Sequence, residues 1–264
     1  MGYMTSIGLY VPTWTGLTIS AFTFGSIITT LAIATLVNGT TPYSKFGNRA
    51  NIDNIPSKKA MLIIYTPCVI ACLFIQRPGL SSQFDIAHLF ALIHFSKRVF
   101  EVLFVHIYKS KTDLETTLSI SSTYTITTVL DLLVVRGIPE NVFSSTLTKF
   151  GIVFFVAGEI INVYHHLLLR NMRSTRRSGV KGYSLPKGGL FEYILVPHYL
   201  SEQITFLGLI LVSQNIVSVT LRLFPFIYLS TRAAATRAWY SIHLTDKQDK
   251  AKLLKRKNLI PFVW

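Results

Sequence analysis

The sequence has few charged residues and very few acidic ones. Only 14% of its 264 residues are charged, with 12 Asp and Glu against 26 Lys and Arg, whereas 50% are hydrophobic. A positive mean hydropathy is unusual for a soluble domain of this length, and it indicates several membrane-spanning helices. The basic residues lie between apolar runs rather than on one amphipathic face, so the net charge of +14 does not indicate nucleic-acid binding.

The residue patterns of several common sites are also missing. Cys68 and Cys72 are four residues apart inside one apolar run, which predicts neither a disulfide nor a zinc site. Only two of the seven histidines are adjacent, and the HxxHH-type boxes of membrane di-iron oxygenases are absent, so we expect no metal. We expect single histidines, such as His88, His106 and His243, to bond a backbone carbonyl or a neighbouring helix. The sequence also lacks GxGxxG, GxxxxGKS/T and a nucleophile elbow, which leaves a soluble-type nucleotide site and a serine hydrolase without support.

Long apolar runs, in contrast, are plentiful. A bilayer core requires about 20 mostly apolar residues per helix. The N-terminus has no basic segment before its first apolar run, which predicts no cleaved signal peptide. The sequence predicts one all-α domain over residues 1–264, a polytopic membrane protein in which seven transmembrane helices enclose a cavity, at about 16–37, 60–76, 84–107, 116–135, 149–169, 190–212 and 214–231.

The basic residues are distributed unevenly between the two sides of this predicted bundle. With seven spans, 20 of the 26 Lys and Arg fall on the side of the C-terminus. The opposite loops hold Arg77, Arg136 and Lys149. This asymmetry is typical of cytosolic loops and predicts a cytosolic C-terminus. Attraction to anionic lipid and binding of a cofactor phosphate are further uses of the same charges.

Three of the predicted spans carry ionisable residues at helical spacing. A charge near the bilayer centre costs about 2.5–3.5 kcal/mol on insertion scales, so such residues pair, face a cavity or function. Lys97 and Arg98 can each pair with Glu101 on one helix face, which would be a purely structural use. One such stripe could be a hydrogen-bond ladder between helices, whereas three that converge predict a polar pocket. The stripes are His94, Lys97, Arg98 and Glu101; Glu159, Asn162 and His166; and His198, Tyr199 and Glu202.

Four segments together resemble a known enzyme family. They are "GEIINVYHHLLLRNMR", "YSLPKGGLFEYILVPHYLSE" at 183–202, "RAAATRAWY" and the terminal "LIPFVW". The chain is similar to the steroid 5α-reductase and enoyl-CoA reductase family from about residue 60 onward, and the C-terminal family region covers about 110–264. "HFSKRVFEVLFVHIYKS" and "SKKAMLIIYTP" look most like the plant members.

The resemblance implies a fold and a reaction. Members of that family are seven-helix membrane proteins, located in the endoplasmic reticulum in most eukaryotes. They reduce a carbon–carbon double bond conjugated to a carbonyl and use NADPH as the reductant. We therefore expect polar groups of the three stripes to line a cofactor and substrate cavity, with the 183–189 loop over the cofactor phosphates.

The resemblance also implies roles for individual residues. Tyr199 matches the tyrosine that resembles the proton donor of enoyl-CoA reductases, and Glu202 the acid of the PNYxxE motif. His198 replaces the motif's amide and either supplies protons or holds the cofactor amide. Residues at cofactor-binding positions are Asn162, Arg173, Tyr183, Arg98, His94, Arg232 and Tyr240.

Some family positions differ here. Phe95 stands where relatives have the tyrosine of HYxxR, and a phenylalanine cannot donate to a carbonyl. The acid before the second span is missing, with Tyr65 nearby as a substitute, and the FxDYP motif is replaced by a longer basic stretch.

The sequence thus leaves open a 3-oxo-Δ4-steroid 5α-reductase, a very-long-chain trans-2-enoyl-CoA reductase, and a diverged non-catalytic membrane lipid-binding protein. Its expected partners are the membrane and a lipid substrate, a steroid or an acyl-CoA. A membrane methyltransferase is a more distant alternative.

Overall fold

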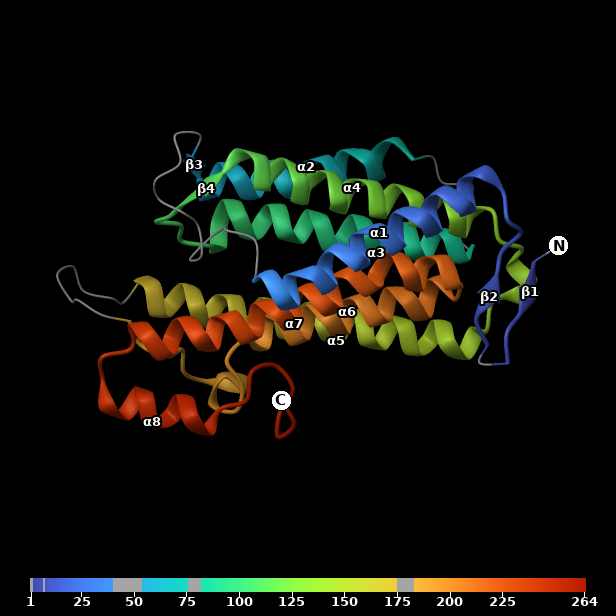
Figure 1. Ribbon diagram of the computed structural model, residues 1–264. Coiled ribbons are helices and arrows are strands. Elements are labelled where there is room, and N and C mark those ends of the chain that lie inside the picture. The colour runs from blue at the N-terminus through green and yellow to red at the C-terminus, as the bar shows by residue number, and fades with distance from the viewer. Residues whose placement is uncertain (1, 7, 40–53, 76–81, 175–182) are drawn as a thin grey trace.

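The computed structural model describes residues 2–6, 8–39, 54–75, 82–174 and 183–264, and it is mostly helical. Figure 1 shows the long helices lying side by side along one axis, with α8 beside one end of the bundle and β1–β2 at the other. The long helices are α1 Gly16–Asn38, α2 Ser57–Phe74, α3 Gln83–Phe100, α4 Leu114–Arg136, α5 Ser145–Ser174, α6 Pro197–Ser213 and α7 Ile216–His243.

Shorter elements join and extend these helices. The strands pair as β1 with β2 and as β3 with β4, both antiparallel. The short elements are β1 Tyr3–Met4, β2 Tyr10–Val11, β3 Asn54–Pro56, the π-helix η2 Glu101–Val105, β4 Lys111–Asp113, the 3₁₀ turns η3 Glu140–Val142 and η4 Gly189–Glu192, and α8 Lys247–Lys255.

Polar residues set where several helices begin. Thr15 and Thr18 form a capping box at α1, and Ser82 and Asp85 form another at α3. Asn215 accepts from the Ser218 N–H at the start of α7. Each cap satisfies backbone N–H groups that the first turn of a helix leaves without a partner, which costs most where water is scarce.

Four of the described helices, α1, α2, α4 and α5, are long and apolar enough to cross a membrane. The multi-pass membrane character predicted from composition is therefore supported. The seven runs each fall on one of the seven long helices, but the count of seven spans and the enclosed cavity stay predictions.

The predicted sixth span begins too early. Residues 190–192 belong to the η4 turn, and α6 begins only at Pro197. Leu195 donates its N–H to the Lys257 carbonyl at 2.9 Å, and Lys257 donates to the Tyr193 carbonyl at 2.8 Å, so this stretch pairs with the C-terminal segment instead of continuing the helix. Hydrophobicity alone did not reveal that pairing.

Helices α5 and α6 approach each other closely because glycines line their contact. A Cβ on Gly158 would lie 2.6 Å from the Thr205 nitrogen, and one on Gly208 would lie 2.5 Å from the Phe155 nitrogen. Small residues at such contacts allow helix backbones to pack tightly in membranes. The contact holds the middle of α5 against the middle of α6, next to the turns that carry the polar stripes of both helices.

Candidate functional site

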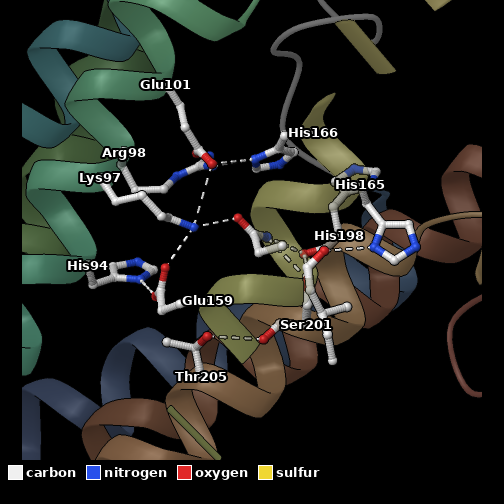
Figure 2. Close-up of polar contacts among 12 residues, drawn as sticks. His94, Lys97, Arg98, Glu101, Glu159, His165, His166, His198, Ser201 and Thr205 are labelled. Carbon is white, nitrogen blue, oxygen red and sulfur yellow. Dashed lines mark hydrogen bonds and ion pairs between the residues drawn. The ribbon is translucent and has the colours of Figure 1, made fainter. Parts of the chain in front are cut away.

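The polar stripes of α3 and α5 meet directly (Figure 2). Glu159 on α5 contacts two residues of α3: its Oε1 lies 2.6 Å from His94 Nδ1, and its Oε2 forms an ion pair with Lys97 Nζ at 2.7 Å. All three side chains are largely shielded, with exposed side-chain fractions of 3%, 14% and 10% for His94, Lys97 and Glu159. A carboxylate can remain charged at such a site because it is paired and hydrogen-bonded.

Glu101 forms the second centre of this network, where α3 turns into the π-helix η2. Its Oε2 lies 2.8 Å from Arg98 Nη1, and its Oε1 lies 3.0 Å from His166 Nδ1 on α5. Lys97 Nζ is 3.7 Å from the same carboxylate. The sequence predicted both pairings within α3; the structure adds His166 from the facing helix. π-Helical turns are frequent at functional sites because they redirect side chains.

Arg98 links the network to α2. Its Nη2 donates to the Tyr65 hydroxyl at 2.8 Å, and its guanidinium carbon lies 4.8 Å from the centre of the Tyr65 ring. Because the phenol oxygen accepts this bond, its own proton remains available for donation to another acceptor. Tyr65 is 7% exposed. The guanidinium would stabilise negative charge that develops on a partner of this hydroxyl.

Asn162 connects α3, α5 and α6. Its Oδ1 accepts from Lys97 Nζ at 2.6 Å, and its Nδ2 donates to the His198 carbonyl at 2.9 Å and to Ser201 Oγ at 3.2 Å. Both amide protons are thus committed, whereas Oδ1 can accept one more bond. In this arrangement Asn162 can bind a further N–H donor but cannot donate to a ligand.

We call eight of these residues the polar cluster: Tyr65, His94, Lys97, Arg98, Glu101, Glu159, Asn162 and His166. They come from α2, α3, the π-helical turn η2 that continues α3, and α5.

The α6 residues lie around the polar cluster but do not all enter it. The His198 ring is 5.6 Å from the His166 ring, centre to centre. Glu202 is 7% exposed and lies within electrostatic range of Tyr65 and Arg98. Tyr199 instead packs, together with Tyr240 of α7, against a separate hydrophobic core that we call the C-terminal core: Leu185, Leu195, Val196, Ala233, Leu244, Leu253 and Leu259.

The remaining predicted residues lie near the end of the bundle that carries α8. Arg173, at the end of α5, is exposed and donates to the Ile107 carbonyl at 2.8 Å. Tyr183 pairs with Leu244 as a β-bridge and makes an edge contact with Trp239 at 4.4 Å. Arg232 is 2% exposed within α7. Three further basic residues of the loop after α5, Arg176, Arg177 and Lys181, lie outside the described residues.

An open hollow lies beside these residues, between the end of α5 and the loop before η4. Its volume is about 350 Å³, and its walls are apolar with a few polar groups. In the loop between η2 and β4, burial raises the pKa of Tyr108, so this phenol stays protonated and neutral close to the charge of Arg173. The residues that line the hollow are Leu168, Asn171, Met172, Ser184, Leu185 and Lys187.

Three side chains of the site have atoms that a metal ion prefers. The ligand atoms of Glu101, His106 and His166 lie within 4.8 Å of one another. However, Arg98 Nη1 lies 2.8 Å from Glu101 and 3.4 Å from His166 Nδ1. A metal cation would have to displace that guanidinium, so this arrangement fits an ion-paired arginine better. The expectation of no metal stays a prediction.

Sequence spacing missed some of these contacts. Spacing indicated no particular partner for His106, and the turn at η2 brings its ring to 4.6 Å from that of His166 on α5. The Lys97–Asn162 bond also joins two stripes that spacing could only place on separate helices. The expectation for His88 and His243 is confirmed, because they lie 2.7 Å and 2.8 Å from the Cys72 and Trp239 carbonyl oxygens.

The fold and site together define a class: a helical membrane protein with a buried, charge-balanced polar cluster shared by three helices. Sequence comparison places the chain more narrowly. The sequence family described as 3-oxo-5-alpha-steroid 4-dehydrogenase matches residues 117–264, more than half of the chain, and the protein belongs to this family.

Individual relatives show how far the similarity extends. The chain is 35% identical over 113 residues to "3-oxo-5-alpha-steroid 4-dehydrogenase 1" of Rattus norvegicus, covering 43% of this chain and 40% of the relative. It is 32% and 31% identical over 114 residues to "Steroid 5-alpha-reductase DET2" of Gossypium hirsutum and Arabidopsis thaliana, covering 43% of this chain and 42% and 41% of those relatives. The match thus spans about two fifths of these curated relatives.

Proposed function

We propose that this protein is an oxidoreductase acting on CH–CH groups. It uses NADPH to reduce the carbon–carbon double bond of a 3-oxo-Δ4-steroid. The observation that carries this proposal is the Tyr65–Arg98 pair inside the polar cluster, a buried phenol backed by a guanidinium. Family membership and the names of the relatives support the substrate class.

The residues fit the chemistry of such a reduction. NADPH, when bound, would supply the hydride for the β-carbon and would be oxidised to NADP⁺. Negative charge then grows on the carbonyl oxygen, where a fixed donor in a dry site stabilises it. Tyr65 can donate there while Arg98 holds its oxygen. The α-carbon takes a proton from a side chain, which solvent restores, and Tyr199 and His198 on α6 are the candidates for that step.

The site also has groups suited to a nicotinamide cofactor. Asn162 retains an acceptor for a carboxamide N–H, because its Oδ1 receives only the bond from Lys97 among the contacts described here. Arg173 and Lys187 lie near the hollow at the end of α5 and could meet phosphate oxygens. The other proposed site residues hold or shape either the polar cluster or the hollow at the end of α5. They are His94, Glu202, Tyr183, Arg232 and Tyr240.

The cellular placement belongs to the same proposal. Seven spans would place the C-terminus in the cytosol and the N-terminus in the lumen of the endoplasmic reticulum. A glycosylation tag after Trp264 should then remain unmodified, whereas one before Met1 should be glycosylated. The reverse pattern would remove this topology and the cytosolic location of the cofactor-binding end.

The deciding experiment is an assay with two substrate classes. Protein purified in detergent is mixed with NADPH and either a 3-oxo-Δ4-steroid or a trans-2-enoyl-CoA, and the loss of nicotinamide absorbance is followed with product analysis. Turnover with the steroid supports the proposal. Turnover with the acyl-CoA alone would assign the chain to fatty-acid elongation. Lipid binding without turnover of either would indicate a non-catalytic lipid-binding protein.

A further inference from the structure

The C-terminal residues form an exposed apolar patch. Phe262 and Val263 are 79% and 71% exposed, and Phe262 lies 5.8 Å, ring to ring, from the half-exposed Tyr193. A turn closes this segment, with Leu259 and Ile260 donating to the Trp264 carbonyl at 2.9 and 2.7 Å. We call Tyr193, Ile260, Phe262, Val263 and Trp264 the C-terminal patch.

Buried and partly buried hydrogen bonds hold the segment that leads into the patch. Arg237 donates to the Leu253 carbonyl at 2.8 Å and to Asn258 Oδ1 at 2.5 Å. Arg256, only 2% exposed, donates to the Pro186 carbonyl at 2.7 Å. These contacts hold the residues just before the patch against the protein, while the side chains of Phe262 and Val263 stay exposed.

Phe262 also has an unusual backbone conformation. Its φ is 65°, in the left-handed region that residues other than glycine rarely adopt. This conformation costs free energy, which a compensating contact of the exposed ring would offset.

The patch continues an apolar face of α5. Val153, Val156, Ile160, Tyr164 and Leu167 are each 38–64% exposed and recur at three- to four-residue spacing. Helix α5 is long and apolar enough to span a membrane, so this stripe is a lipid-facing surface. η4 lies on it, because a Cβ on Gly189 would be 2.6 Å from the Tyr164 ring, and Tyr193 follows η4 directly.

A run of basic residues precedes the C-terminal part of the patch in the sequence. Residues 246–257 contain six Lys and Arg against two Asp. Figure 1 shows the C-terminus beside the flank of the bundle, not beyond its end. Aromatic residues next to lysines are typical of the interface between headgroups and acyl chains. We propose that the C-terminal patch docks into the interface of the anionic bilayer that the helices span, with Phe262 and Val263 at the acyl boundary and the lysines at the headgroups.

This docking would also support the reaction site. The C-terminal segment contacts the loop before α6 through Arg256 and Pro186, through Lys257 and Tyr193, and through Asp249, which accepts from the Leu185 N–H at 3.0 Å. That loop leads into the first turn of α6, which carries His198. Lipid contact at the patch therefore steadies the segment that bounds the polar cluster.

A site-specific probe tests the proposal without any activity measurement. Val263→Cys receives an environment-sensitive fluorophore in the full chain, and selective labelling is feasible because Cys68 and Cys72 are buried. The labelled protein is placed in nanodiscs of phosphatidylcholine with or without phosphatidylserine. Quenching is measured with acrylamide in water and with lipids that carry a nitroxide near the acyl-chain top. Gln248→Cys, on the exposed side of α8, is the matched control.

We expect the label at 263 to be quenched by the lipid nitroxide and shielded from acrylamide, and the label at 248 to show the reverse. Adding Phe262→Ser should return the label at 263 to water. Lys255→Gln and Lys257→Gln should weaken docking by about fivefold each, from about 1 kcal/mol per charge near an anionic surface. Lys149→Gln, exposed near the start of α5, should change nothing.

Three results would overturn the proposal. Equal acrylamide quenching at 263 and 248 would leave the patch in water. Shielding from acrylamide without quenching by the lipid nitroxide would mean that a second protein copy covers it. Equal shielding with and without phosphatidylserine would remove the anionic surface as its partner.

Discussion

Two buried ionic groups lie toward opposite ends of the bundle and are built differently. In the polar cluster, Glu101 and Glu159 share Lys97, and they also contact Arg98, His94 and His166, with His106 Nε2 at 3.9 Å from Glu101. Toward the other end, Asp131 of α4 pairs with Arg222 of α7, with Ser213 Oγ at 3.5 Å from the carboxylate. We call Asp131 and Arg222 the distal pair.

The difference shows what each group can tolerate. Both groups have buried atoms without a hydrogen-bond partner in the described part of the chain: Asp131 Oδ1 and Arg222 Nε in the distal pair, Arg98 Nε and Glu159 Oε2 in the polar cluster. The groups differ because each ion of the distal pair faces a single opposite charge among the described residues. Loss of either residue leaves a buried charge uncompensated, so the pair can only hold helices together. In the polar cluster, each carboxylate contacts several donors, so charge can be redistributed when a substrate carbonyl becomes negative. The comparison predicts that substitutions in the polar cluster change activity, whereas substitutions in the distal pair change stability.

The largest expected effect is on turnover. Tyr65→Phe keeps the ring and removes the hydroxyl that Arg98 holds, so turnover should fall by about 10²–10⁴-fold, the usual contribution of general acid catalysis, with little change in thermal stability. The measurement is steroid reduction together with a melting curve in detergent.

Tyr199→Phe is the matched variant. Tyr199 is the donor that the family resemblance predicts, although its ring packs on the C-terminal core. If Tyr199→Phe loses turnover and Tyr65→Phe does not, the donor lies on α6, and the polar cluster only positions it. Unchanged turnover in both variants would assign proton transfer to solvent.

The distal pair should respond in stability. Arg222→Met leaves Asp131, which is 0% exposed, without its opposite charge, and unfolding should become easier by about 3–5 kcal/mol. Adding Asp131→Leu should restore most of that loss, because the buried charge is then removed as well. Denaturant unfolding in detergent measures both. A single variant as stable as the native chain would contradict the assigned role of this pair.

Sequence patterns predicted one end of the bundle better than the other. The stripes of α3 and α5 were visible because Lys97, Arg98, Glu101, Glu159 and Asn162 recur at helical spacing inside apolar runs. Which atoms meet between the helices was not predictable, since that depends on the rotation and offset of α5 against α3. The distal pair was missed for the same reason, because Asp131 and Arg222 are 91 residues apart in the chain.

Local chemistry explains the remaining differences. The true start of α6 was hidden because Tyr193–Leu195 are apolar enough for a helix but pair with Lys257, a contact that only the tertiary fold creates. The π-helical turn at Glu101 has no sequence signal, and it is what brings His106 toward the cluster.

A smaller effect should separate cofactor binding from the chemistry of the cluster. Arg173→Ala should weaken NADPH binding by about 1.5–3 kcal/mol, the range for hydrogen bonds to charged groups, and NADH binding by less. Calorimetry with both cofactors measures this. Equal affinities of the native chain for NADPH and NADH would contradict a role for this basic end in recognising the 2′-phosphate.

The smallest expected effect joins stability and activity in one variant. A Cβ at Gly158 would lie 2.6 Å from the Thr205 nitrogen and 2.8 Å from the Ser201 carbonyl oxygen, so Gly158→Ala must push α6 away from α5. Overpacking of this kind costs about 1–3 kcal/mol. Asn162 lies one helical turn further along α5, and its bonds to His198 and Ser201 would lengthen as α6 moves. Melting temperature and cofactor affinity should therefore fall together.

Gly137→Ala is the control for that variant, because a Cβ there would meet the Val134 and Leu133 carbonyl oxygens at ordinary distances of 3.5 and 3.9 Å. That substitution should leave cofactor affinity unchanged. If Gly158→Ala lowers the melting temperature and leaves NADPH affinity intact, the α5–α6 contact supports the fold alone. Asn162 would then owe its position to Lys97 rather than to the close approach of the two helices.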